Sequence, residues 1–223
     1  MRNDADSLRP VDERFAVRSL YWSGFSAIRR AKHEAHGDAP NARAPGPVPV
    51  AIKAATTALL VFDIVDPICT TQPKCIATMV PAITSLLATA RSAGMLVLYG
   101  TRGPTLSKWL TQVAPAQGDQ VIQSYAQDRF YNTDLDKILK DKGITTLILT
   151  GWKVSGSVVY TSVGATARGY TVVVPIDASL ATTDYETTIG LFQILTQFDA
   201  NATNEPLKAK ASTLSRTDMI TIQ

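Results

Sequence analysis

The chain has 223 residues, of which 45% are hydrophobic and 18% are charged, as expected for an ordinary folded protein with one sizeable core. The formal net charge is +3, and the excess lies in residues 1–55, which hold nine basic and six acidic side chains. Because acidic residues are interleaved with the basic ones, we do not expect nucleic-acid binding. No apolar run approaches the roughly 18 residues of a membrane span. The N-terminus also lacks the apolar core of a secretory signal, so we expect no membrane partner and a cytoplasmic location.

The first segment of the chain is predicted to be a helical arm. Residues 11–36 are predicted to form one or two helices with a loose apolar face. Residues 37–49 hold four prolines and two glycines, which indicates a linker. Since this linker separates the arm, residues 1–55, from the rest of its own chain, we expect the arm to pack on a neighbouring subunit of a homo-oligomer.

Residues 56–198 are predicted to form the folded core, in which strands and helices alternate. The predicted strands are 57–64, 95–99, 145–150 and 170–176, and the predicted helices are 77–92, 105–113, 134–142, 157–168 and 183–198. Strands that are apolar on both faces and alternate with helices indicate a parallel sheet covered on both sides. Right-handed crossovers make this a doubly wound α/β fold, a three-layer sandwich. Residues 199–223 are polar and are predicted to be a C-terminal tail.

The cysteines and histidines limit the chemistry of the core. Cys69 and Cys75 are six positions apart. A disulfide between them is geometrically allowed, but two cysteines without a secretory signal favour free thiols. The only histidines, His33 and His36, lie in the N-terminal arm. The core can therefore form neither a Cys/His metal cluster nor a Ser-His-Asp triad, and we expect no metal and no other cofactor.

Two polar residues are predicted to meet at the carboxyl edge of the sheet. Asp63 follows the first apolar strand, where a partly desolvated carboxylate can act as an acid–base; a helix-capping or loop-bonding role is the alternative. The third predicted strand ends in a turn at Gly151, and the next helix starts near Ser157. Such turns place backbone N–H groups and a side chain where α/β proteins bind ligands. Ser157 is either a nucleophile or a helix-capping residue.

The turn resembles that of the isochorismatase-like cysteine hydrolases, whose pattern is Gly-x-x-Thr-x-x-Cys-Val-x-x-Thr. Gly151, Val158 and Thr161 fit this pattern, and Ser157 stands in place of the nucleophilic cysteine. The resemblance covers about residues 56–198, and it implies that Asp63 corresponds to the catalytic aspartate of the family.

The resemblance also implies a catalytic lysine, which this chain lacks. In the family this lysine precedes a Phe-x-x-Thr-x-Leu pattern, which begins here at Phe130; counting back six places gives Ser124. Arg129 is the only cation nearby, and a guanidinium can orient a carboxylate but does not exchange protons near neutral pH. Lys153 lies where vinyl-ether-cleaving relatives place a substrate-facing side chain. It is either a proton donor or anion clamp, or a solvated surface lysine.

The resemblance implies a hydrolase of a small amide, imide or enol-ether substrate, with an oxyanion hole formed by backbone N–H groups around Gly156 and Ser157. The catalytic candidates are Asp63, Ser157 and Lys153, and the substrate-binding candidates are Ser124, Arg129, Phe130, Trp152, Gly156 and Thr161. The alternative is a catalytically inactive binding or scaffolding protein that retains the fold, which the loss of two catalytic residue types favours. A pocket open beside Asp63 would favour the enzyme. A pocket filled by Trp152 or Phe130 would favour the binding protein.

Overall fold

The computed structural model describes residues 46–103, 108–197 and 212–223. The predicted helices of residues 11–36 and the expected contact of the arm with another subunit lie outside the described residues.

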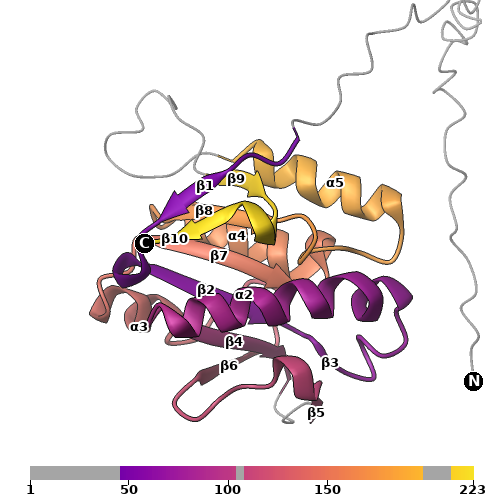
Figure 1. Ribbon diagram of the computed structural model, residues 1–223, viewed down its shortest axis with the longest axis horizontal. Coiled ribbons are helices and arrows are strands. Elements are labelled where there is room, and N and C mark those ends of the chain that lie inside the picture. Colours follow the sequence, from indigo (N-terminus) through magenta and orange to yellow (C-terminus); the bar gives the residue numbers. More distant parts are fainter. Residues whose placement is uncertain (1–45, 104–107, 198–211) are drawn as a thin grey trace, which may run out of the picture. The chain divides into compact units, whose positions relative to one another are not determined.

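A parallel sheet of six strands forms the centre of the described fold, in the order β6-β4-β2-β7-β8-β9 (Figure 1). Its strands are β2 (Thr57–Phe62), β4 (Leu96–Arg102), β6 (Gln120–Ser124), β7 (Thr146–Gly151), β8 (Thr171–Pro175) and β9 (Ser212–Ser215). All neighbouring pairs run parallel. The chain starts at β2 in the middle of the sheet and adds strands on both sides, so the predicted α/β class with a central parallel sheet is confirmed.

Helices cover both faces of the sheet. Successive side chains of each strand point to opposite faces, so each face carries apolar side chains that pack against helices. The core on one face holds Leu59 and Val61 of β2 together with α2 (Val80–Ser92) and the π-helical turn η2 (Cys75–Met79) that precedes it. The core on the other face holds Leu60 and Phe62. The helices of this second face are α3 (Leu135–Asp141), α4 (Val159–Thr166) and α5 (Asp184–Leu195). The result is three layers (Figure 1).

The helix that runs from η2 through α2, Cys75–Ser92, has the length and apolar composition of a membrane span, contrary to the expectation from sequence. Its buried side chains include Ile83, Leu86 and Leu87, and these pack in the core beneath the sheet. The apolar composition is therefore that of a core helix in an α/β fold.

Two separate two-stranded sheets accompany the six-stranded sheet and correct the predicted boundaries. β1 (Val50–Ile52) pairs in parallel with β10 (Ile220–Ile222), and β3 (Val65–Asp66) pairs antiparallel with β5 (Lys108–Trp109). Short 3₁₀ turns flank these strands at η1 (Ala54–Thr56), η3 (Thr111–Val113) and η5 (Thr217–Met219). The prediction of a tail over 199–223 is therefore wrong for residues 212–222, and the folded unit includes β1 in the segment assigned to the arm. The helix predicted over 105–113 is also wrong where the chain is described.

The missed strands share a weak sequence signal. β9 has the sequence Ser-Thr-Leu-Ser, and only Leu214 contributes an apolar side chain to the core. The hydroxyl group of Ser215 is buried and donates a hydrogen bond to the carbonyl of Val48 at 2.8 Å, which lets a polar residue lie inside. β6 has only five residues and is partly exposed, so neither strand shows the continuous apolar run of a central strand.

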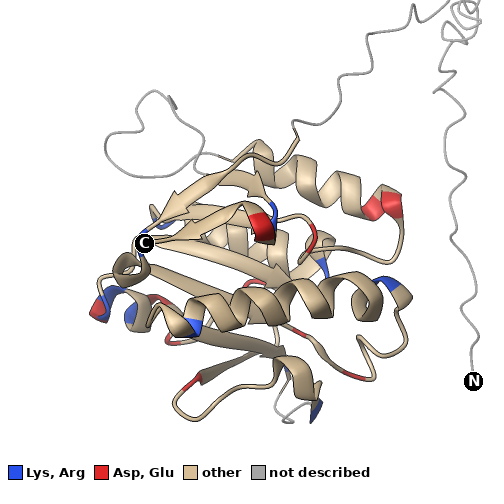
Figure 2. Cartoon of the chain, in the orientation of Figure 1, with Lys and Arg blue, Asp and Glu red and all other residues tan. Residues whose placement is uncertain are grey.

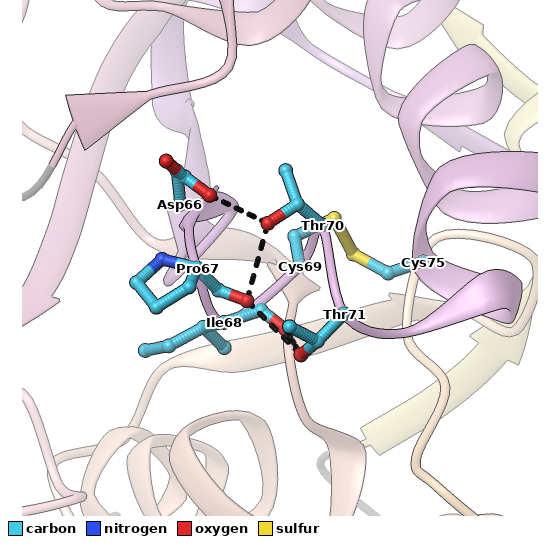
Figure 3. The surroundings of a disulfide bond; sticks show 7 residues. All are labelled: Asp66, Pro67, Ile68, Cys69, Thr70, Thr71 and Cys75. Atoms are coloured by element: carbon cyan, nitrogen blue, oxygen red, sulfur yellow. Dashed lines mark hydrogen bonds between the residues drawn. A yellow bond between two sulfur atoms is a disulfide. The ribbon is translucent and has the colours of Figure 1, made fainter.

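Cys69 and Cys75 form a disulfide, so the expectation of free thiols is wrong (Figure 3). Their Cα atoms are 5.4 Å apart, within the usual range for a disulfide, and both side chains are buried. The bond closes the loop between β3 and η2, in which the Thr70 hydroxyl donates to the Asp66 carboxylate at 2.6 Å. Composition could not reveal this pairing, because it depends on how the turn brings the two Cα atoms together.

A glycine is required at position 151, the last residue of β7, which lies opposite Phe62 of β2. Its φ is +128°, and a Cβ at this position would lie 2.2 Å from the Phe62 carbonyl oxygen. We expect Gly151→Ala to lower the free energy of unfolding by more than about 3 kcal/mol, because backbone strain and steric overlap add. Gly143→Ala is the control: φ there is +68°, but a Cβ at Gly143 would have no atom of the described residues within 4 Å apart from its chain neighbours, so strain alone should cost about 1–2 kcal/mol. Urea unfolding measures the free energy of unfolding of both variants. Equal losses would contradict the role of the close contact between Gly151 and Phe62.

Candidate active site

Asp63, Arg129 and Ser157 form a closed set of contacts at the carboxyl edge of the sheet. The Ser157 Oγ donates to Asp63 Oδ2 at 2.6 Å. The Arg129 Nη2 donates to the same carboxylate oxygen at 2.5 Å and to Ser157 Oγ at 3.0 Å. All three side chains are buried. Each of the three polar groups therefore contacts the other two in a place largely withdrawn from water.

Asp63 is held at the edge of the sheet just beyond the last residue of β2. Its N–H donates to the carbonyl of Gly100 in β4 at 3.1 Å, which continues the ladder by one residue. Its φ is +54°, the left-handed region that aspartate tolerates better than most residues. The chain turns at this point, and the carboxylate contacts groups on two other segments.

Ser157 lies in the π-helical turn η4 (Val154–Val158) between β7 and α4. The N–H of Val154 donates to the carbonyl of Leu180 at 2.9 Å, which ties the start of the turn to the segment after β8. Helix α5 presses against the same turn at Gly190, where a Cβ would lie 3.0 Å from the backbone nitrogen of Ser155. These contacts fix the backbone that carries Ser157.

The guanidinium of Arg129 is held from several sides. Its Nη1 donates to the carbonyls of Ser124 at 3.2 Å and Ala126 at 2.9 Å, and its backbone N–H donates to Thr161 Oγ1 at 3.1 Å. The carbon at its centre lies 5.8 Å from the centre of the Phe62 ring. Because an arginine stays charged in proteins, the site contains a fixed cation beside Ser157.

The capping alternatives for Asp63 and Ser157 are wrong. The side chain of Ser157 bonds to Asp63 and Arg129, and no side-chain hydrogen bond caps either η4 or α4. Asp63 likewise bonds to residues 66 and 94 positions further along the chain. The Ser157 hydroxyl and the Asp63 carboxylate therefore form hydrogen bonds between different segments at the edge of the sheet, not within a helix end.

A pocket of about 150 Å³ opens beside these groups. Its lining residues are Asp63, Ile68, Arg102, Ala126, Gln127, Arg129, Trp152, Lys153, Gly156 and Ser157. The volume is below the roughly 300–1,000 Å³ of drug-sized sites, so only a small molecule, or a small part of one, fits inside. Trp152 forms a wall of the pocket without filling it.

Three predicted substrate-binding residues do not line this pocket. The Ser124 hydroxyl accepts the N–H of Ala126 at 3.1 Å and so shapes the loop that carries Arg129. Thr161 ties α4 to the same loop, since its hydroxyl accepts from Arg129 and donates to the carbonyl of Gln127 at 3.2 Å. Phe130 is buried and stacks on Tyr170 with ring centres 5.9 Å apart. These residues support the site and do not face a ligand there.

Lys153 and Gly156 line the pocket but are partly engaged by the protein. The Lys153 Nζ pairs with Glu186 Oε1 in the first turn of α5 at 2.5 Å, and this hydrogen bond lowers the pKa of Glu186. The Gly156 N–H donates to the carbonyl of Lys153 at 3.0 Å. The expectation that the Gly156 N–H is available for an oxyanion is therefore wrong in this structure.

Four lining residues of the pocket were not predicted from the sequence: Arg102, Ile68, Ala126 and Gln127. Arg102 ends β4 and lies at the same sheet edge as Asp63, so the rule that ligands bind at the carboxyl ends of parallel strands could have found it. Ile68, Ala126 and Gln127 lie on loops whose position beside the pocket depends on tertiary packing. In the described ranges, no group of three or more His, Cys, Asp and Glu side chains is placed to hold a metal ion.

The geometry defines an α/β protein with a Ser–Asp–Arg cluster at the carboxyl edge of its parallel sheet. Residues 57–205 match the model of the isochorismatase domain, so the chain belongs to the isochorismatase family. A comparison with curated proteins gives no match.

Solved structures share the fold. N-carbamoylsarcosine amidase from Thermoplasma acidophilum is 24% identical, with a TM-score of 0.59, over 73% of this chain and 97% of that chain. An isochorismatase family protein from Burkholderia thailandensis is 20% identical, with a TM-score of 0.62, over 78% and 96%. A ribonuclease from Caenorhabditis elegans is 15% identical, with a TM-score of 0.60, over 76% and 81%. At these identities the likeness extends to the fold alone.

Proposed function

We propose that this protein is a hydrolase of a small amide or imide, with Ser157 as the nucleophile in place of the family's cysteine and Asp63 as the acid–base. The observation that carries this proposal is the 2.6 Å hydrogen bond from the Ser157 hydroxyl to Asp63 beside an open pocket. A nucleophile within hydrogen-bond reach of a base, which is itself oriented by a third group, is the arrangement of nucleophilic catalysis.

The proposed reaction has two stages. The Ser157 Oγ attacks the carbonyl carbon while its proton passes to Asp63 Oδ2, and the C–N bond breaks as Asp63 gives that proton to the leaving nitrogen. Water then attacks the acyl-serine ester, Asp63 takes a proton from the water, and Ser157 Oγ regains that proton as the carboxylic acid leaves.

Arg129 takes the place of the family's lysine in this proposal. A serine hydroxyl is much harder to ionise than a thiol, so it needs stabilisation of the negative charge that develops on Oγ. The Arg129 Nη2, 3.0 Å from Ser157 Oγ, provides a charged donor at that point. Because the guanidinium keeps its protons, Asp63 alone moves protons through the reaction.

A catalytically inactive binding protein is the second candidate, and the hydrogen bonds of Asp63 favour it. The oxygen that would accept the Ser157 proton, Oδ2, is already bonded to Arg129. The other oxygen, Oδ1, is buried without a hydrogen-bond partner among the described residues. An oxygen that already accepts hydrogen bonds from both Arg129 and Ser157 has little room to take part in proton transfer, which would suit a site that binds a ligand without turnover.

Turnover on a panel of small amides, imides and one enol ether tests the proposal. We expect the wild type to hydrolyse an amide or imide and Ser157→Ala to lower kcat/KM by about 10³-fold or more. Ser155→Ala, in the same turn but outside the pocket lining, is the matched control and should retain activity. No turnover on the whole panel would favour the binding protein. Enol-ether cleavage at equal rates by wild type and Ser157→Ala would replace the covalent mechanism by one that uses Asp63 alone.

A further inference from the structure

We infer that the ligand of this pocket is a small carboxylate, held by Arg102, so that the substrate of the proposed hydrolase is an amide that also bears a carboxylate group. The claim that a carboxylate binds at Arg102 is argued from the charges of the pocket. The claim that the substrate is an amide rests on the proposed function.

The charges that line the pocket do not balance. Asp63 is the only acidic residue among its lining residues, and Arg102, Arg129 and Lys153 are the cations. Arg129 is paired with Asp63 at 2.5 Å. Lys153 is paired at 2.5 Å with Glu186, in the acidic first turn of α5 that is red in Figure 2. One positive charge, that of Arg102, is left over.

Arg102 has no acidic partner in the described part of the chain. None of the ion pairs found there includes its guanidinium. The sequence of the adjoining residues 104–107 is Pro-Thr-Leu-Ser, which has no acidic side chain. Arg102 is the last residue of β4, opposite Ser124 in the register with β6, and its side chain is exposed at the pocket. An accessible guanidinium at the carboxyl edge of a parallel sheet is therefore open to a ligand.

The chemistry of this cation selects a carboxylate. A guanidinium presents two parallel N–H donors that match the two oxygens of a carboxylate, and it carries a permanent charge. The pocket is small, about 150 Å³, so a ligand that contacts Arg102 also reaches the neighbourhood of Ser157 Oγ. A short molecule that carries both a carboxylate and an amide could therefore contact Arg102 and Ser157 at the same time.

Calorimetric titration with succinamic acid and with succinamide tests the inference, because the two differ in whether one end is an anion. The wild type should bind the anionic half-amide at millimolar concentration or below. Arg102→Gln should weaken that binding about tenfold or more and change binding of the neutral diamide less than about twofold. Lys142→Gln, which removes one exposed positive charge outside this pocket, is the control for net charge and should bind like the wild type.

The outcomes separate the carboxylate site from the hydrolase. If Arg102→Gln binds both probes as the wild type does, or if the wild type fails to bind the half-amide, the carboxylate site is overturned even where amide turnover is found. If no amide is hydrolysed and yet Arg102→Gln selectively loses the anionic probe, the hydrolase proposal fails and the carboxylate site stands. A matched loss of both probes in Arg102→Gln also overturns it, because charge recognition would then play no part.

Discussion

Asp63→Asn is expected to abolish hydrolysis, with kcat/KM reduced by about 10³-fold or more. The asparagine has nearly the same shape and its carbonyl oxygen can still accept the hydrogen bond from Ser157, but an amide cannot take up the proton of the nucleophile. Asp63 is the only residue of the Ser–Asp–Arg cluster that can both accept and return a proton, since Arg129 stays charged. The loss should therefore appear mainly in kcat.

Steady-state kinetics of Asp63→Asn, on the substrate identified by the panel of amides, imides and enol ether, tests this prediction. Urea unfolding shows whether the variant is folded. Asp66→Asn is the matched control, because Asp66 lies three residues further on, is exposed, bonds to Thr70 and does not line the pocket. It should keep most of the activity. Equal activity of Asp63→Asn and the wild type would overturn the role of Asp63.

Arg129→Met is expected to lower the free energy of unfolding by about 3–5 kcal/mol, the cost of breaking a buried ion pair by removing one partner. The side chain of Arg129 is 1% exposed and that of Asp63 is 7% exposed, so the carboxylate would be left buried without its cation. Methionine keeps much of the length and apolar stem of arginine, so the loss reports the charge and the hydrogen bonds of the guanidinium and not the packing of its stem.

The double variant Asp63→Asn/Arg129→Met separates the ion pair from packing. It leaves no uncompensated charge, so it should be more stable than Arg129→Met alone, and the two losses should not add. Arg168→Met is the control for an exposed arginine, since Arg168 lies over the Phe130 ring at 4.7 Å, and it should cost about 1 kcal/mol or less. Urea unfolding of the set checks this. A loss of less than about 1 kcal/mol for Arg129→Met, or strictly additive losses, would show that the pair does not hold the site together.

The four strands β2, β4, β7 and β8 and the helices α2 to α5 could be predicted because their signals are local. β2 is a continuous run of six buried residues, and Thr183 caps the start of α5 in a capping box with Glu186. β9 could not be predicted, because a four-residue polar strand is stabilised by its partner β8 and by buried hydroxyl contacts, which sequence periodicity does not contain. The disulfide was missed for the same reason, since it depends on a turn in space.

The site was predictable where it follows from sheet topology. Asp63 and Ser157 each come just after a parallel strand, and the carboxyl ends of such strands meet at one edge. Counting six places back from Phe130 indicated Ser124, the last residue of β6, but the residue whose side chain reaches Asp63 is Arg129 in the following loop. The direction of a loop side chain depends on contacts such as those of Arg129 with Thr161 and Ala126, which the sequence does not contain. The pairing of Lys153 with Glu186 likewise joins residues 33 positions apart.

Acylation of Ser157 is the most direct test of the proposed mechanism. The wild type is mixed with the p-nitrophenyl ester of a small acid, quenched, and analysed by intact-mass and peptide mass spectrometry. We expect one acyl group on Ser157 in the wild type, none in Ser157→Ala, and acylation slower by about 10²-fold or more in Asp63→Asn. Sustained turnover with Ser157 unmodified at every time point, or an acyl group on another residue that survives Ser157→Ala, would contradict Ser157 as the nucleophile.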